Sequence, residues 1–316
     1  MLTNKNEVRF FIFLGAILCI LLGVTFIVGN RVLHDAPSLP AKVAVNPFDS
    51  VTLTAKAAYV LDVRTGKVLY SKNSDARLPY ASLTKVMTAV VATTLAKPTS
   101  TVVISQEAVD TEGDSGLRVG EVWSLKNLID FSLASSSNDG ARAIALSIGA
   151  LGDLADTTPN GAENNFIKEM NAEAAKIGMA QTYYLNDTGL DQSTVQGGAY
   201  GTAKDMATLF NYILKTYPQM MEATREPSFK VSSESGIVHT AQNTDAIVDM
   251  IPGLIASKTG YTDLAGGNLV VAFDPEIGRP IIISVLGSTE DGRFQDMGAL
   301  VNASLEYIQG DIQSSK

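Results

Sequence analysis

Segments with the pattern of β-strands lie near both ends of this 316-residue chain, and helical patterns fill the part between them. The strand-like segments are residues 57–63 and 67–70 near the start, and 268–273 and 281–286 near the end. When strands from both ends join one sheet, the helical part between them has to pack against it. The order of elements therefore predicts an α+β fold, an antiparallel β-sheet flanked by helices.

Apolar side chains recur at helical spacing in the middle of the chain and again near its end. The first of these helices opens at Ser82 and stops before Pro98, and Lys85 lies one turn after Ser82 on the same side. Thr202 with Asp205 is typical of a capping box that starts another helix. The predicted helices cover residues 82–96, 124–133, 139–148, 162–178, 203–217 and 294–308.

The stretch of residues 10–28 carries no charged side chain and is long enough to span a bilayer. Lys5 and Arg9 precede it, which places the N-terminus in the cytoplasm and the rest of the chain outside. A cleaved signal peptide is the alternative, but no Ala-x-Ala pattern follows the apolar run. We therefore expect a single-pass transmembrane helix in the cell membrane, with the folded part on the extracytoplasmic side.

Four regions follow from these patterns. Residues 1–30 are expected to form a cytoplasmic tail and membrane anchor, and residues 31–56, which contain Pro37, Pro40 and Pro47 without helical periodicity, an extended stalk. The folded domain is expected over residues 57–309, with a short tail at 310–316.

The composition excludes several classes of function. A net charge of -9 and a pI near 4.8 argue against a nucleic-acid partner, which would require clustered Lys and Arg. The one cysteine, Cys19, lies in the apolar run, so the folded part has no disulfide, cysteine zinc site or thiol nucleophile. The only histidines are His34 and His239, which makes a multi-histidine metal site unexpected. We expect neither a metal nor another cofactor.

Three short motifs follow one another along the folded part: Ser82-Leu83-Thr84-Lys85, Ser136-Ser137-Asn138 and Lys258-Thr259-Gly260. Each is weak by itself. Together they fall at a helix start, in a tight polar loop between two helices, and on a strand before the final hairpin. These are places from which side chains can converge on one cleft, and the trio indicates a serine acyl-transfer site.

The Ser82 hydroxyl attacks a carbonyl only if a base takes its proton. Neither His34 nor His239 is marked as that base by its surroundings, whereas Lys85 is one helical turn away. A lysine acts as a base only when neutral, which requires burial or a nearby cation that lowers its pKa. We expect Lys258 to be that cation or to attract a substrate carboxylate.

The remaining motif residues have possible roles around this pair. Ser136 can relay a proton to the leaving amine, and Asn138 can hold the substrate amide. Gly260 lets the backbone approach a substrate, so its strand can pair with a peptide. Each residue also has an ordinary structural alternative: Ser82 as a helix cap, Lys85 as a solvated charge, Ser136 and Asn138 as loop residues, and the Lys258 motif as a strand end.

The three motifs together resemble those of the D-alanyl-D-alanine carboxypeptidases, which are low-molecular-weight penicillin-binding proteins of the serine β-lactamase/transpeptidase-like superfamily. The resemblance covers about residues 55–309 and implies their fold. Further matching segments are Tyr80-Ala81, Asn186-Asp187-Thr188-Gly189-Leu190, Tyr200-Gly201-Thr202-Ala203-Lys204-Asp205 and Tyr261-Thr262.

The resemblance implies a reaction and a set of roles. Ser82 would form an acyl-enzyme with the penultimate D-alanine of a peptidoglycan stem peptide and release the terminal D-alanine, and β-lactams would acylate the same serine. Lys85 would be the base, and Ser136 would complete the catalytic set. The residues implied for substrate binding are Asn138, Lys258, Thr259, Gly260 and Tyr261, with the backbone N–H groups of Ser82 and Tyr261 as an oxyanion hole.

Other functions on the same fold stay open. A β-lactamase needs a deacylating glutamate, commonly in a Glu-x-x-Leu-Asn stretch, and none lies between the second and third motifs. A transpeptidase or endopeptidase uses the same acyl-enzyme with another acceptor or scissile bond. A non-catalytic, membrane-tethered binder of peptidoglycan or β-lactams would need neither Ser82 nor Lys85.

Overall fold

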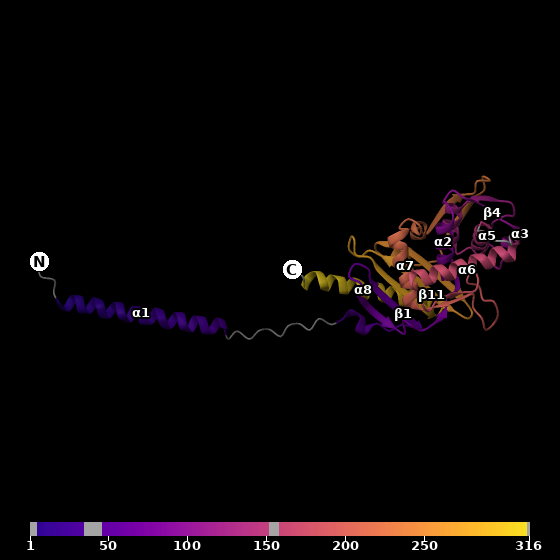
Figure 1. The fold of residues 1–316 in the computed structure, drawn as a ribbon. Coiled ribbons are helices and arrows are strands. Elements are labelled where there is room, and N and C mark those ends of the chain that lie inside the picture. Colours follow the sequence, from indigo (N-terminus) through magenta and orange to yellow (C-terminus); the bar gives the residue numbers. More distant parts are fainter. Residues whose placement is uncertain (1–4, 35–45, 152–157, 315–316) are drawn as a thin grey trace. The chain divides into compact units, whose positions relative to one another are not determined.

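The computed structural model describes residues 5–34, 46–151 and 158–314 (Figure 1), in two compact units, Met1–Val45 and Asn46–Lys316. In the first unit, helix α1 (Lys5–His34) contains a stretch, Lys5–Ile27, with a mean hydropathy of 2.9 that is long and apolar enough to cross a membrane. A signal sequence near an N-terminus has the same properties, so an anchor and a cleaved leader both fit this helix.

A five-stranded antiparallel sheet forms the centre of the second unit, in the order β10-β11-β12-β1-β2. Its strands come from the two ends of the unit, as the sequence predicts. β10 is an edge strand, which is important for the site. The bounds are β1 (Ala57–Asp62), β2 (Val68–Lys72), β10 (Leu254–Thr262), β11 (Gly266–Phe273) and β12 (Ile281–Ser288).

Both faces of this sheet are covered by other parts of the unit, and alternate residues of one strand point to opposite faces. Along β11, Leu269 and Val271 pack with helix α8 (Gly292–Ser314), whereas Val270 and Ala272 belong to the core shared with the helical part of the unit. Two-sided burial explains why β11 and β12 are almost continuously apolar. The fold is therefore α+β with an antiparallel sheet between layers of helices.

Between β2 and β10 the chain is mainly helical, and the predicted helices are present with shifts of a few residues at their ends. Thr202 caps α7 by accepting from the Asp205 amide, as the capping pattern predicts. The helices are α2 (Thr84–Leu95), α3 (Gln106–Val109), α4 (Leu125–Ser135), α5 (Asn138–Gly149), α6 (Pro159–Ile177) and α7 (Ala203–Thr216), with 3-10 turns η1 (Pro47–Ser50), η2 (Ala81–Leu83), η3 (Glu222–Arg225) and η4 (Val248–Met250).

Among the described residues, three small antiparallel sheets lie outside the central one, and the periodicity of the sequence does not predict them. His239 is on β9, as expected for a strand residue, and its buried ring lies 3.0 Å from the Glu121 carboxylate. The strands are β3 (Leu78–Pro79), β6 (Tyr183–Tyr184) and β7 (Ala199–Gly201), then β4 (Thr101–Val103) with β5 (Val122–Ser124), and β8 (Ser228–Ser232) with β9 (Val238–Gln242).

The predicted stalk at 31–56 falls partly outside the described residues, which omit 35–45. Within its described part, Phe48 of η1 stacks on Tyr70, and the amide of Ala55 donates to Asp296 at 2.8 Å. Helix α8 extends to Ser314, into the region expected as a tail. The four-region division otherwise stays a prediction.

Candidate active site

Ser82 is presented by a turn that is fixed from two sides. The preceding residue, Ala81, has a φ of 49°, in the left-handed region that non-glycine residues rarely adopt. From β11, the side-chain amide of Asn268 donates to the carbonyl oxygens of Pro79 and Tyr80, at 3.0 Å each. Ser82 lies in the 3-10 turn η2, and α2 begins at Thr84, two residues after the helix start predicted at Ser82.

The Ser82 hydroxyl accepts a hydrogen bond from Lys85 and caps no helix. The two atoms, Lys85 Nζ and Ser82 Oγ, are 2.8 Å apart, and neither η2 nor α2 has a side-chain cap at its start. Lys85 also donates to the carbonyl oxygen of Thr188 at 2.8 Å, and it is 1 % exposed. The geometry favours a nucleophile–base pair over the alternatives of a helix cap and a solvated lysine.

Burial lowers the pKa of Lys85 to about 7, and the carboxylates of Asp187 and Asp139 oppose that shift. Burial also holds the pKa of Lys258 well below its usual value, and repulsion from Lys85 and Arg293 lowers it further. Desolvation is therefore the main cause for Lys85. Repulsion between two ammonium groups is mutual, so the expectation that Lys258 helps to lower the pKa of Lys85 stays a prediction.

The second and third motifs meet in a hydrogen bond. Lys258 Nζ, from β10, donates to Ser136 Oγ at 2.9 Å and to the carbonyl oxygen of Thr259, also at 2.9 Å. Ser136 lies in the tight loop between α4 and α5, where the sequence predicts it. Its backbone is left-handed, with a φ of 59°. The Thr259 hydroxyl bonds to that of Thr244.

Asn138 opens α5 and makes different contacts from the two lysines. Its amide nitrogen donates to the carbonyl oxygen of Glu112 at 2.7 Å. Its Oδ1 atom is buried and has no hydrogen-bond partner among the described residues. A buried acceptor without a partner is costly unless a ligand or water satisfies it. This oxygen has almost no exposed surface, so the expected role of Asn138 in holding a substrate amide stays a prediction.

Gly260 lies directly against the turn that carries Ser82. A methyl group placed on it would be 2.8 Å from the Tyr80 carbonyl oxygen and 3.2 Å from the Ser82 amide nitrogen. The guanidinium of Arg293 bonds its carbonyl oxygen at 3.0 Å and holds this end of the strand. Tyr261, which follows, is exposed and helps to line a cavity of about 510 Å³ together with Glu112 and Asp191.

We expect Gly260→Ala to lower the acylation rate about 100-fold, because the clash with backbone atoms moves the Ser82 turn away from β10. It should also cost about 1 to 3 kcal/mol of folding free energy. Stopped-flow acylation by a chromogenic cephalosporin, with urea unfolding in parallel, measures both effects. Gly298→Ala, where a methyl group meets no atom within 4 Å, is the matched control. Equal acylation rates in the two variants would contradict the close contact.

Several site residues carry no independent signal in the sequence. Thr188 accepts from Lys85, but only the resemblance of its segment draws attention to it. Thr244 and Arg293 reach the third motif from elsewhere in the chain, and no spacing rule connects them to it. Contacts of this kind depend on the tertiary fold.

Comparison with known families gives one match over most of the chain. Residues 42–290 match the peptidase S11 family, described as D-alanyl-D-alanine carboxypeptidase. D-alanyl-D-alanine carboxypeptidase DacF of Bacillus subtilis is 31% identical over 244 residues, which are 75% of this chain and 59% of that protein. A D-alanyl-D-alanine endopeptidase of Pseudomonas aeruginosa is 33% identical over 231 residues, 69% of this chain and 67% of that one.

Solved structures agree with this match. Penicillin-binding protein D2 from Listeria monocytogenes, in its ampicillin-bound form, superposes with a TM-score of 0.66 at 29% identity. The superposition covers 80% of this chain and 98% of the Listeria chain. The chain spans about three fifths of the length of the Bacillus protein.

Proposed function

The chain belongs to the D-alanyl-D-alanine carboxypeptidase family of serine peptidases, and on that premise we propose that it removes the terminal D-alanine from peptidoglycan stem peptides through an acyl-enzyme on Ser82. The observation that carries the proposal is the 2.8 Å contact between Ser82 Oγ and the buried amine of Lys85. A lysine with a pKa of about 7 is partly neutral at physiological pH and can take the serine proton.

In the acylation step, Ser82 Oγ forms a bond to the carbonyl carbon of the penultimate D-alanine, and its proton passes to Lys85 Nζ. The amide C–N bond then breaks, and the proton held by Lys85 passes through the Ser136 hydroxyl, which also accepts a hydrogen bond from Lys258, to the leaving D-alanine amine. Water hydrolyses the resulting ester and returns Ser82 to its free form. The amide N–H groups of Ser82 and Tyr261 stabilise the oxyanion.

Lys258 and Thr259 hold the terminal carboxylate of the substrate in this proposal. A carboxylate at Lys258 offsets the desolvation that lowers the pKa of this lysine, so binding favours its charged form. β10 is an edge strand, so an extended peptide can pair with it as an additional strand. Asn138 then holds the substrate amide. The cavity next to Tyr261 offers room for the rest of the stem peptide.

The proposal extends to inhibitors and location. The ampicillin-bound Listeria protein supports β-lactams as covalent inhibitors that acylate Ser82. The apolar helix α1 supports a membrane anchor through residues 10–28, with the catalytic unit on the extracytoplasmic side where peptidoglycan lies. A cleaved signal peptide would deliver the unit to the same compartment without an anchor.

A D-alanyl-D-alanine endopeptidase is the second candidate, because the Pseudomonas relative carries that name. The test is to incubate the full chain in detergent with a stem pentapeptide, and separately with a cross-linked dimer of stem peptides. A carboxypeptidase releases D-alanine from the pentapeptide, and an endopeptidase separates the dimer. Covalent binding of penicillin without either product would favour a binder or a transpeptidase instead.

A further inference from the structure

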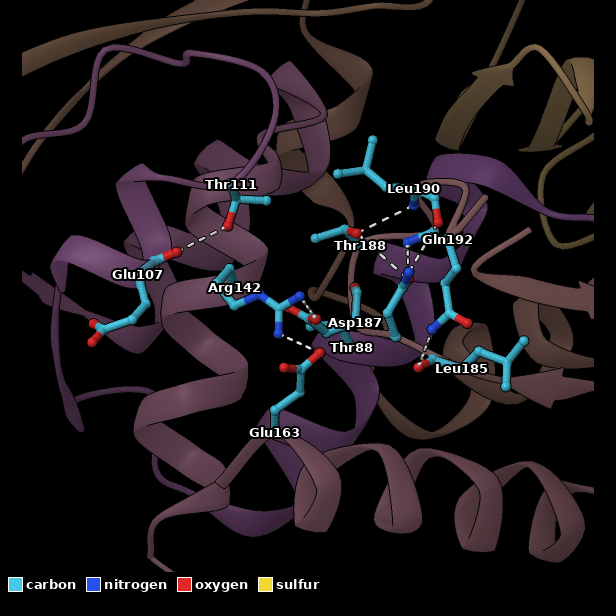
Figure 2. A network of polar contacts seen from close by, with 12 residues as sticks. Thr88, Glu107, Thr111, Arg142, Glu163, Leu185, Asp187, Thr188, Leu190 and Gln192 are labelled. Carbon is cyan, nitrogen blue, oxygen red and sulfur yellow. Dashed lines mark hydrogen bonds and ion pairs between the residues drawn. The ribbon is translucent and has the colours of Figure 1, made fainter. Parts of the chain in front are cut away.

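An ion-pair network lies next to the segment whose backbone accepts a hydrogen bond from Lys85. Asp187 is fully buried, and its Oδ1 atom is 3.1 Å from Arg142 Nη2 of α5. The other Arg142 nitrogen, Nη1, is 2.5 Å from Glu163 Oε1 of α6. Figure 2 shows the guanidinium of Arg142 between the two carboxylates. The proposed reaction uses none of these three side chains.

The backbone next to Asp187 contacts the helix that carries the base. The Asp187 carbonyl oxygen accepts from Thr88 at 2.6 Å, and the Thr188 carbonyl oxygen accepts from Lys85 at 2.8 Å. Lys85 and Thr88 are on one face of α2. A methyl group on Gly189 would fall 1.8 Å from the Ala81 carbonyl oxygen, so the same segment also packs closely against the turn before Ser82. The position of this segment therefore determines where Lys85 points.

The Thr188 carbonyl oxygen is a hydrogen-bond acceptor only, which is important for a neutral amine. A neutral Lys85 has two N–H donors and one lone pair. The Thr188 oxygen takes one N–H, which directs the lone pair toward the Ser82 hydroxyl so that the hydroxyl can donate to it. A displaced carbonyl would leave the amine free to rotate, and the proton acceptor would no longer face Ser82.

We propose that Asp187 and Arg142 are positioning residues for Lys85: their buried ion pair holds the Thr188 carbonyl against the Lys85 amine and places a negative charge behind it. The inference rests on the proposed roles of Ser82 and Lys85 for its effect on catalysis. Its effect on Lys85 itself is independent of those roles.

The charged groups that face each member give the direction of the pH effect. Lys85 faces the carboxylates of Asp187 and Asp139, which raise its pKa against the effect of burial, and the ammonium of Lys258, which repels it. Asp187 faces Arg142 and Lys85, which lower its pKa, and Glu163, which raises it. Burial is the largest cause for Asp187 and brings its pKa to about 6. Near pH 7 its carboxylate is therefore mostly ionised and supports the protonated form of Lys85.

The test is a titration of Lys85 in the full chain in detergent, labelled with ¹³C at lysine Cε. The Lys85 resonance is the one that disappears in Lys85→Arg. We expect Asp187→Asn to move the titration midpoint of Lys85 to lower pH, because the substitution removes a negative charge without changing the size of the side chain. Arg142→Gln should move it the same way, since Asp187 without Arg142 keeps its proton near neutral pH.

Asp62→Asn is the matched control, because Asp62 forms another buried ion pair that lies outside the site. Its Oδ2 atom is 3.0 Å from Arg279 Nη2. This control should destabilise the fold and leave the Lys85 midpoint unchanged. The acylation rate above pH 8 should fall about 10- to 100-fold in Asp187→Asn with an unchanged number of acylated sites, whereas partial unfolding would reduce that number. In the double variant, Arg142→Gln should add little to Asp187→Asn.

An unchanged Lys85 midpoint in Asp187→Asn overturns the proposal, as does an equal shift in Asp62→Asn. If Asp187→Asn does not fold, Arg142→Gln decides by the same midpoint. The titration needs no turnover, so the two proposals can fail separately. An unaltered chain that is never acylated, but whose Lys85 midpoint responds to Asp187→Asn, would contradict the proposed function and leave the positioning role in place.

Discussion

Ser82→Ala is expected to lower D-alanine release from a stem pentapeptide about 10⁴- to 10⁶-fold, because the variant lacks the atom that forms the acyl-enzyme. The fold should be nearly unaffected. The Ser82 hydroxyl caps neither η2 nor α2, and its hydrogen bond comes from Lys85. Coupled-enzyme detection of D-alanine measures the first effect, and urea unfolding measures the second.

Ser124→Ala is the matched control for this substitution. Ser124 does cap a helix: its hydroxyl accepts from the Asn127 amide at 3.3 Å at the start of α4. The control should lose about 1 kcal/mol of folding free energy and keep its turnover. The two variants should therefore give opposite results. Ser82→Ala should lose activity and keep its stability, whereas Ser124→Ala should lose stability and keep its activity. A Ser82→Ala protein that loses stability and retains turnover would make Ser82 a structural residue.

Lys85→Met is expected to lower the acylation rate about 10²- to 10⁴-fold by removing the base. In the unaltered chain this rate should rise with pH through about 7, since Lys85 accepts a proton only when neutral and its folded pKa is about 7. The methionine variant should lack that rise. Stopped-flow acylation between pH 5 and pH 9 measures the rate and its pH dependence together.

The same substitution should stabilise the fold most at low pH. The pKa of Lys85 falls from 10.5 to about 7 on folding, so the unfolded chain binds the proton more tightly. The resulting penalty is complete below the folded pKa and disappears as the pH rises through the unfolded value. Methionine carries no such penalty, and the gain in unfolding free energy should be about 1 to 4 kcal/mol at pH 6 and smaller at pH 10.

Lys72→Met provides the comparison for both measurements. Lys72 is half-buried on β2 and donates to the Leu53 carbonyl oxygen at 2.9 Å, outside the site. Its replacement should leave the acylation rate unchanged. A Lys85→Met protein with the acylation rate of this control would remove Lys85 from the mechanism. A stability gain that is the same at pH 6 and pH 10 would contradict the low pKa.

The central sheet is predictable from the sequence, because its long strands are marked by runs that are apolar on both faces. β11 and β12 are the clearest examples. β10 is less clear, since Lys258 and Thr259 interrupt its apolar pattern, and only its place before the final hairpin indicates a strand. The small sheets have strands of two to five residues, such as β6 and β7, and lengths of this kind are too short for a period to be detected.

The prediction of the site depends on local motifs. Ser82 and Lys85 are one turn apart, so helical geometry alone predicts that they meet. The contact between Ser136 and Lys258 joins residues 122 positions apart, and it follows only from the order of the motifs and their resemblance to a family. The ion pair of Arg142 with Asp187 has neither kind of signal. Burial of Lys85, the main cause of its low pKa, depends on the complete fold.

The role of Ser82 as the nucleophile is tested by locating the covalent adduct after the full chain has reacted with penicillin. Proteolytic digestion and mass spectrometry should find one penicilloyl group per chain, on the peptide that contains Ser82, and no adduct in Ser82→Ala. Formation of this adduct should slow as the pH falls below about 7. An adduct on another residue, such as Ser136, or the absence of any adduct would contradict Ser82 as the nucleophile.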